Sequence, residues 1–338
     1  DGKQIDTEYE VLEWSDLVQA SMQTGILATY AQLFITAWIY ISTGALRRLS
    51  WLRKGPIVAA LYPIGLLLAQ ALIAVFVAWV AGAILSRSIY PNVGWIVALP
   101  IIVVILRWFR KHDSKFFAYY LMHDYAFSAR LRGANPPELE QRMQVFAQAI
   151  TSALTSDVDE VLVVGHSSGV NLAVSILADV IRANRVPPNS PALGFLSLGQ
   201  VVPMQSFLPN AHRLRADLRD LSVAKALTWV DVSAPGDGCS FALCDPVSVS
   251  GVAPNERIWP LVISAAFSQT LSPERWQSMR RRYFRLHFQY LCAFDRPADY
   301  DYFQITAGAM TLGDRFRGRK PSNSRIDVAA SRYRSVRA

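Results

Sequence analysis

The segment 165–169, Gly-His-Ser-Ser-Gly, has the residue types of a serine nucleophile held on a sharp turn. It follows Glu160–Val164, whose continuous apolar run is typical of a buried parallel strand. It precedes Val170–Ala183, where apolar residues recur at helical spacing. Flanking glycines would let the strand and the helix approach closely while the hydroxyl projects from the turn. This arrangement predicts Ser167 as a nucleophile for acyl transfer.

A serine nucleophile needs a general base, and histidine is the usual one. The chain has five histidines, of which His212 and His287 follow Ser167. His212 lies in a polar stretch that precedes the candidate acids, whereas His287 lies in Tyr283–Leu291, a segment with the residue types of a late strand. We therefore expect His287 to be the base.

An acid must orient the imidazole and stabilise its charged form. Residues 227–232 are predicted as another buried strand, and the loop after it contains Asp237 between two glycines. Asp237 is the preferred acid. Asp231, near the end of the same strand, is the alternative, and Asp245 is a more distant third candidate.

Together, the serine turn, the aspartate loop and the histidine segment resemble the serine hydrolases and lipases of the α/β-hydrolase superfamily, where nucleophile, acid and histidine follow in this order. The resemblance implies an α/β fold with a mostly parallel sheet flanked by helices. It implies four roles: Ser167 as nucleophile, His287 as general base, Asp237 as orienting acid and the Ser168 backbone N–H as one oxyanion donor. We expect no cofactor and no metal, because the sequence has no Walker loop, dinucleotide fingerprint or metal-spaced cluster.

The resemblance covers residues 1–20 and 110–314, and it departs from the family pattern at its N-terminal end. The family's second oxyanion donor comes from a loop after an early strand. Glu8–Trp14 is predicted as a strand, but the few residues before it contain no such loop. We therefore expect one or two N-terminal strands to be missing. Losing one oxyanion donor lowers the rate about 100- to 1,000-fold.

Two apolar runs interrupt the resemblance and predict a membrane hairpin. Residues 57–85 carry no charge and are longer than the roughly 20 residues that a spanning helix needs. Residues 93–109 follow after a short turn and are predicted as the returning helix. Basic residues flank the pair, and only Arg87 lies in the turn, so the positive-inside rule places both flanks on the cytoplasmic side of an inner or plasma membrane.

Residues 25–45 form a third uncharged, apolar segment. Its polar residues fall on one stripe at helical spacing: Thr29, Gln32, Thr36 and Thr43. The stripe favours a helix lying in the membrane interface. A single extra crossing would also place residues 1–20 on the opposite side from the rest of the hydrolase-like domain.

Four regions are thus expected along the chain. They are an N-terminal strand region (1–20), a membrane-associated insertion (21–110), an α/β-hydrolase domain (111–314) and a basic tail (315–338). The tail carries eight basic residues against Asp327 alone, so it accounts for most of the net charge of +8. The nearly neutral body gives no indication of a nucleic-acid groove. We expect the tail to be disordered and to bind anionic lipid head groups.

The predicted function is that of a membrane-embedded serine hydrolase, which cleaves acyl esters of lipids or other apolar esters through an acyl-enzyme. A lipid acyltransferase would use the same triad with an acceptor other than water. A non-catalytic membrane scaffold built on a hydrolase fold is the third hypothesis. The three cysteines lack the spacing of a zinc site, and we expect them to be reduced thiols.

Overall fold

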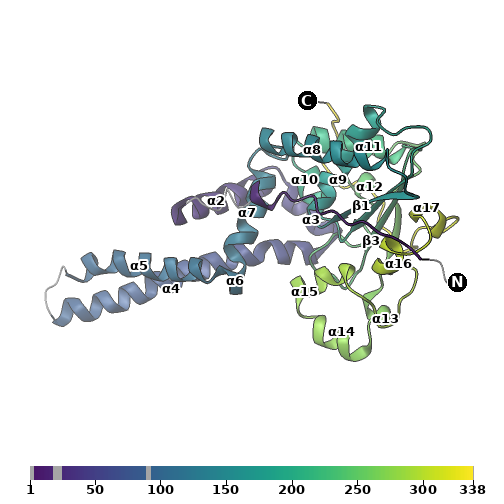
Figure 1. Cartoon of the computed structure of the whole chain (residues 1–338). Coiled ribbons are helices and arrows are strands. Elements are labelled where there is room, and N and C mark those ends of the chain that lie inside the picture. Colours follow the sequence, from purple (N-terminus) through teal and green to yellow (C-terminus); the bar gives the residue numbers. More distant parts are fainter. Residues whose placement is uncertain (1–3, 18–24, 89–92, 338) are drawn as a thin grey trace. The chain divides into compact units, whose positions relative to one another are not determined.

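The computed structural model describes residues 4–17, 25–88 and 93–337 (Figure 1). The chain divides into two compact units, which we name the sheet unit and the helical unit. The sheet unit contains Asp1–Trp14, Tyr40–Val58 and Leu131–Ala338, and the helical unit contains Ser15–Ile39 and Ala59–Arg130. All the candidate site residues lie in the sheet unit.

Four parallel strands form the centre of the sheet unit, in the order β1-β2-β3-β4. They are β1 (Glu160–His166), β2 (Ala192–Leu198), β3 (Thr228–Ser233) and β4 (Leu261–Ser264). The strands predicted at 160–164 and 227–232 are therefore present. Because all the strands run in one direction, their carboxyl ends share one edge of the sheet, and the loops there bring distant parts of the sequence together.

Apolar side chains of the strands are divided between two core clusters, so that both faces of the sheet are covered. In β2, Phe195 belongs to the first cluster and Leu196 to the second, as the alternation of a strand requires. The longer helices that contribute to the first cluster are α8 (Pro137–Ala153), α9 (Gly169–Arg182) and α11 (His212–Ser222) (Figure 1).

Shorter helices complete the sheet unit. Around the second cluster are α13 (Phe267–Thr270), α14 (Pro273–Met279), α15 (Tyr283–His287), the 3-10 helix η1 (Phe288–Leu291), α16 (Tyr302–Thr306) and α17 (Leu312–Arg315). The others are α3 (Ala45–Leu52), α10 (Val202–Ser206) and α12 (Pro246–Val249). The predicted α/β class, a parallel sheet flanked by helices, is confirmed.

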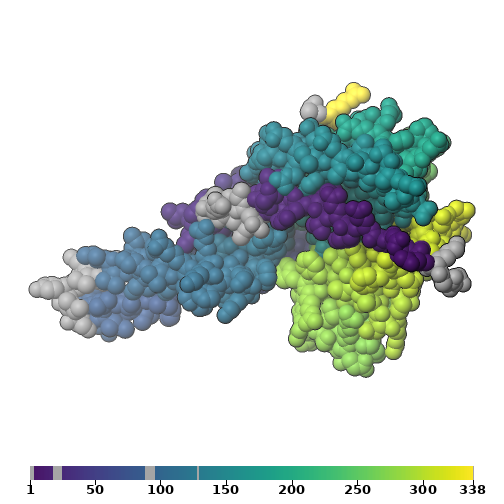
Figure 2. All heavy atoms as spheres, viewed as in Figure 1, coloured from purple at the N-terminus to yellow at the C-terminus, as the bar shows by residue number. Residues whose placement is uncertain are grey.

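The N-terminal segment does not form the strand predicted at Glu8–Trp14. It has no regular secondary structure. Leu12 and Trp14 pack against the first core cluster, and Arg142 Nη1 donates to the Glu13 carbonyl at 2.7 Å. Figure 2 shows the segment as a dark purple band across the surface of the sheet unit. Its apolar residues therefore dock by side-chain packing, which a strand-like pattern does not distinguish from strand pairing.

The strand predicted over Tyr283–Leu291 is also wrong, because this segment forms α15 and η1. Leu286, His287 and Tyr290 are buried, and their separations of three and four residues are those of one helix face. Aromatic residues favour strands only where a pleated surface receives them. Here packing against the second core cluster sets the conformation.

The C-terminal tail, predicted to be disordered, packs on the sheet unit over its described residues. Its backbone makes regular contacts there: Ser322 N donates to Val262 O at 2.9 Å, and Ile326 N donates to Leu243 O at 2.7 Å. Ser331 is buried. The prediction of disorder rested on composition, which does not show that backbone partners exist elsewhere in the chain.

The helical unit is built from α2 (Ile26–Ser42), α4 (Lys54–Ser88), α5 (Val93–Lys111), α6 (Asp113–Phe116) and α7 (Ala118–Ala129); α2 and α4 extend into the sheet unit. Among the described residues, α4 is the one helix long and apolar enough to cross a membrane, with a window of mean hydropathy 2.4. Helices α2 and α3 meet this criterion only as a pair bent by 75°. The helices predicted over 57–85 and 93–109 are present, and their crossing of a membrane stays a prediction.

The polar stripe predicted for residues 25–45 lies largely on the buried side of α2. Thr29 is buried, and its Oγ1 lies 3.3 Å from His123 Nε2 of α7. By contrast, Phe34 is 63% exposed and Trp38 is 67% exposed. The buried side also carries Leu33 and Ile39, so α2 departs from the usual helix in water by exposing large apolar side chains while it buries threonines.

Candidate active site

Ser167 occupies a sharp turn between β1 and α9, as the motif predicts. Its φ of 56° lies in the left-handed region, which costs a non-glycine residue free energy and is concentrated at functional turns. Ser167 N donates to Leu198 O at 3.0 Å, which ties the turn to the end of β2. A Cβ at Gly165 would lie 3.0 Å from Val170 Cα, so glycine permits the close approach there. Gly169 has open space around it and is not required on steric grounds.

Ser168 is the N-cap residue of α9. Backbone N–H groups at the start of a helix have no intrahelical acceptor, and the helix dipole makes this end favourable for negative charge. The Ser168 N–H directly follows Ser167 in the chain and lies at a helix N-terminus. This position would favour the negative charge of an oxyanion formed at Ser167. Its role as an oxyanion donor stays a prediction.

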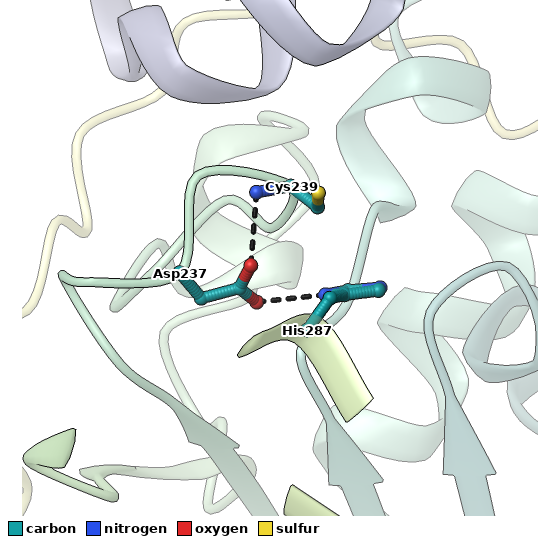
Figure 3. A group of neighbouring side chains, drawn as sticks. All are labelled: Asp237, Cys239 and His287. Carbon is teal, nitrogen blue, oxygen red and sulfur yellow. Dashed lines mark hydrogen bonds and ion pairs between the residues drawn. The ribbon is translucent and has the colours of Figure 1, made fainter. Parts of the chain in front are cut away.

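Asp237 and His287 meet although 50 residues separate them in the chain (Figure 3). Asp237 lies in the loop after β3, and His287 ends α15. The His287 Nδ1 and Asp237 Oδ2 atoms are 2.8 Å apart, and both residues are buried. Burial by itself would raise the pKa of Asp237, but the charge and hydrogen bond of His287, together with further hydrogen bonds to the carboxylate, outweigh it and lower that pKa. With Nδ1 bound to the carboxylate, Nε2 is left to exchange a proton.

Two further donors hold the Asp237 carboxylate in place. The Cys239 backbone N–H donates to Oδ1 at 2.9 Å, and the Tyr290 hydroxyl donates to Oδ2 at 3.0 Å. The Tyr290 oxygen also accepts from Ala234 N at 2.9 Å, which connects it to the end of β3. Sequence reasoning missed Tyr290 because nothing in a helical aromatic segment indicates which ring reaches a distant loop.

The two glycines beside Asp237 are required by the aromatic residues around the loop. A Cβ at Gly236 would lie 2.5 Å from the Trp276 ring, and a Cβ at Gly238 would collide with the Tyr283 ring. The start of α4 also contacts the loop, since a Cβ at Gly55 would lie 2.9 Å from Gly238 O. The Gly-Asp-Gly sequence thus lets the acid loop pass between α14, α15 and the beginning of the long apolar helix.

The alternative acid, Asp231, lies inside the sheet. Its Oδ1 accepts from Ser197 Oγ at 2.6 Å, and burial raises its pKa to about 7. Asp245 caps α12 by accepting from Val247 N and pairs with Arg257 at 2.7 Å. His287 is therefore bonded by Asp237, and the other two aspartates have separate structural partners.

Ser167 and His287 both adjoin the end of β2. Ser167 is bonded to Leu198 O, and a Cβ at the next residue, Gly199, would lie 3.2 Å from His287 Cε1. Within the described part of the chain, no hydrogen bond joins the Ser167 hydroxyl to the imidazole. Such contacts often tighten only when substrate is bound.

His166, the variable residue of the serine motif, contacts the candidate base directly. Its Nε2 donates to the His287 backbone carbonyl at 2.9 Å, and the two ring centroids are 4.6 Å apart. Burial, reinforced by the neighbouring His287, lowers the pKa of His166 to about 4, so this ring is neutral at physiological pH. His166 thereby links the serine turn to the residue that would act as base, and sequence reasoning had assigned it no role.

One ligand-type atom from each of Asp237, Cys239 and His287 lies within 4.8 Å of the other two. Sequence reasoning expected no metal ligand, because these residues are not spaced as a linear metal motif. Comparisons with models of known families, with curated proteins and with solved structures gave no match.

Proposed function

We propose that this chain is a membrane-embedded serine hydrolase of the α/β-hydrolase type. The observation that carries the proposal is the buried hydrogen bond between His287 and Asp237 at the sheet edge where Ser167 occupies a strained turn. The order is also that of the superfamily: the serine follows β1, the acid follows β3, and the histidine comes after β4. A shared edge of parallel strands provides the fixed positions that such a triad needs.

In the proposed reaction, the Ser167 oxygen attacks the acyl carbonyl while His287 Nε2 takes the hydroxyl proton. Asp237 stabilises the resulting imidazolium, and the Ser168 N–H stabilises the negative oxygen. His287 then gives its proton to the departing alcohol as the ester bond breaks. Water, activated by the same imidazole, attacks the acyl-enzyme, which releases the carboxylic acid and regenerates Ser167.

Two observations support a membrane location. The helical unit exposes large apolar side chains on α2, α4 and α5, including Phe34, Phe76 and Leu99. The chain also leaves the sheet unit after Val58 and returns to it at Leu131, which suits an even number of crossings. We propose that α4 and α5 form a hairpin in an inner or plasma membrane, with the sheet unit on the cytoplasmic side as the basic flanks indicate.

We propose acyl lipids or other apolar esters as substrates, because a site fused to a membrane hairpin meets such molecules at the bilayer surface. Exposed arginines of the tail, such as Arg317, would add attraction to anionic head groups. Analysis of the reaction products shows whether water or a second lipid accepts the acyl group. A hydrolase releases free fatty acid from a labelled acyl lipid, whereas an acyltransferase forms a new labelled lipid.

Labelling with a fluorophosphonate tests the nucleophile. The 338-residue chain in detergent micelles is treated with the probe, and we expect covalent label on Ser167, located by peptide mass spectrometry. Ser167→Ala abolishes this label, while Ser156→Ala, which changes an exposed serine of another loop, keeps it. If the native chain takes up no label, or if Ser167→Ala labels equally, the catalytic proposal fails and the scaffold hypothesis gains support.

A further inference from the structure

Cys239 brings a third metal-ligand type to the two residues of the proposed acid-base pair. Asp237, Cys239 and His287 each contribute one ligand-type atom, and these atoms lie within 4.8 Å of one another (Figure 3). Cys239 is intermediate in burial. No other group of this kind occurs among the residues that the structure describes.

We propose that Asp237, Cys239 and His287 form an inhibitory site for Zn²⁺. Thiolate, imidazole and carboxylate are the ligands that zinc takes in proteins, at about 2.0 to 2.3 Å from the metal. In tetrahedral geometry such ligand atoms stand about 3.3 to 3.6 Å apart. The three ligand-type atoms now lie within 4.8 Å of one another, and zinc binding would adjust their separations to that range. The thiolate disfavours Mg²⁺ and Ca²⁺, which prefer oxygen ligands.

Zinc binding by these three ligands requires each of them to have a defined protonation state. The Cys239 thiol releases its proton to solvent as sulfur binds the metal, because the thiolate is the ligand. Asp237 already carries the charge that attracts a cation. His287 binds zinc as the neutral imidazole and keeps one proton, on whichever ring nitrogen does not bind zinc. No oxidant or other co-reactant takes part.

Zinc on either imidazole nitrogen blocks the proposed chemistry. If the metal takes Nδ1, the 2.8 Å hydrogen bond to Asp237 is lost and the ring proton moves to Nε2, which then cannot accept a proton from Ser167. If the metal takes Nε2, it occupies the lone pair that the base requires. The metal site itself does not depend on catalysis, but its inhibitory effect rests on the proposed function.

Direct metal binding is measured first, with Cd²⁺ as a spectroscopic probe for zinc. The chain carrying Cys292→Ser, which removes the exposed thiol, is titrated in detergent micelles while the ultraviolet cadmium–thiolate band is recorded. We expect a band that saturates at one cadmium per chain and disappears when Cys239→Ser is added. Equal melting temperatures of the two proteins show that the second change leaves the fold intact. A band that survives Cys239→Ser would overturn the proposal.

The effect on the proposed active site is measured by fluorophosphonate labelling under Zn²⁺ titration. We expect Zn²⁺ to suppress labelling and a chelator to restore it. The Zn²⁺ concentration that halves the labelling rate should be at least about tenfold higher for Cys239→Ser. Each protein's rate without metal serves as its own reference. Equal zinc sensitivity with and without Cys239 would contradict the proposal. If no labelling occurs even without metal, the serine hydrolase proposal fails, while the cadmium titration still decides whether the metal site exists.

Discussion

Helix α8 of the sheet unit and helix α2, most of which belongs to the helical unit, each have 17 residues but differ in what they expose. Helix α8 buries a face of apolar residues that includes Met143 and Phe146, and it exposes Gln144. Helix α2 exposes Phe34, and its buried side carries Thr29 alongside Leu33. In both media, the groups that the surroundings solvate poorly tend to become buried. Water around α8 and lipid around α2 would therefore account for the different exposed surfaces of the two helices.

The difference also separates the tasks of the two units. The sheet unit holds polar groups in fixed positions by burying them with partners, as it does for Asp237 and Tyr290. The helical unit presents an apolar surface with few charges over the length of α4. The proposed chemistry and the proposed membrane attachment would lie in different parts of the chain, so substitutions in the two parts should have different effects.

The largest expected contrast comes from the same substitution on each helix. Phe146→Lys places a charge in the first core cluster, and losing a buried phenylalanine alone costs about 3 to 5 kcal/mol. An uncompensated charge adds to this, so we expect the sheet unit to lose its folded state, measured by near-ultraviolet circular dichroism. Phe34→Lys, on a residue 63% exposed, should leave the melting temperature in detergent unchanged.

Vesicle flotation completes this comparison. Phe34→Lys is expected to float less readily with lipid vesicles than the native chain, because it places a charge on the apolar face that an interfacial helix inserts among the lipids. Phe34→Leu, which keeps an apolar side chain, serves as the control. If Phe34→Lys unfolds the chain as Phe146→Lys does, the outer face of α2 packs against protein and the contrast between the two helices is wrong.

The sequence predicted the parts of the site that local patterns encode. Ser167 follows from a strand, a glycine-flanked turn and a helix, all within one stretch of chain. The choice of Asp237 and His287 needed only the order of strands and loops, and the structure brings these two residues together. Their neighbours His166 and Tyr290 were missed, because contacts across 121 and 53 residues leave no periodic signal in the chain.

The failed predictions share one physical cause, which is that tertiary partners overrode local propensity. The segment around His287 has strand-forming residues but forms helical turns, because its buried side chains pack against one core cluster. The basic tail has a disordered composition but is held through backbone bonds such as that from Ile326 N to Leu243 O. By contrast, the membrane-like stretch 57–85 was found readily, because uninterrupted apolar length is itself the signal.

A smaller effect should distinguish the buried polar groups of the two units. Asp231 in β3 has a pKa of about 7, above its ordinary value of 3.8, so the native state holds this proton more tightly than the unfolded chain. Its contribution to stability is therefore complete below about pH 4 and is lost as the pH rises through 7, by at most about 1.4 kcal/mol per pH unit. Asp231→Asn removes this pH dependence. The stability of the variant relative to the native chain should therefore increase between pH 5 and pH 8.

The matched change in the helical unit is Gln70→Leu. Gln70 is buried on α4 with no partner for either polar atom of its amide, so its removal should stabilise the chain by about 1 to 3 kcal/mol. Because an amide does not titrate, this gain should be equal at pH 5 and pH 8. Melting temperatures in detergent at both pH values test the pair. A pH-independent difference for Asp231→Asn would show that Asp231 does not titrate in this range.

The most local contrast compares one glycine from each unit. Gly238→Ala brings a Cβ into the Tyr283 ring and shifts the loop that carries Asp237, whereas Gly65 on α4 has open space where a Cβ would lie. A misplacement of about 1 Å at a catalytic group costs up to about 100-fold in rate, so we expect Gly238→Ala to slow fluorophosphonate labelling by about 10- to 100-fold with the fold retained. Gly65→Ala should label at the native rate and gain up to about 1 kcal/mol of stability, as alanine does in a helix. Adding Tyr283→Ala to Gly238→Ala removes the obstructing ring and should recover part of the lost labelling rate. If it recovers none, the backbone preference of alanine displaces the loop. In that case, the aromatic packing around Asp237 is not the reason that glycine is required.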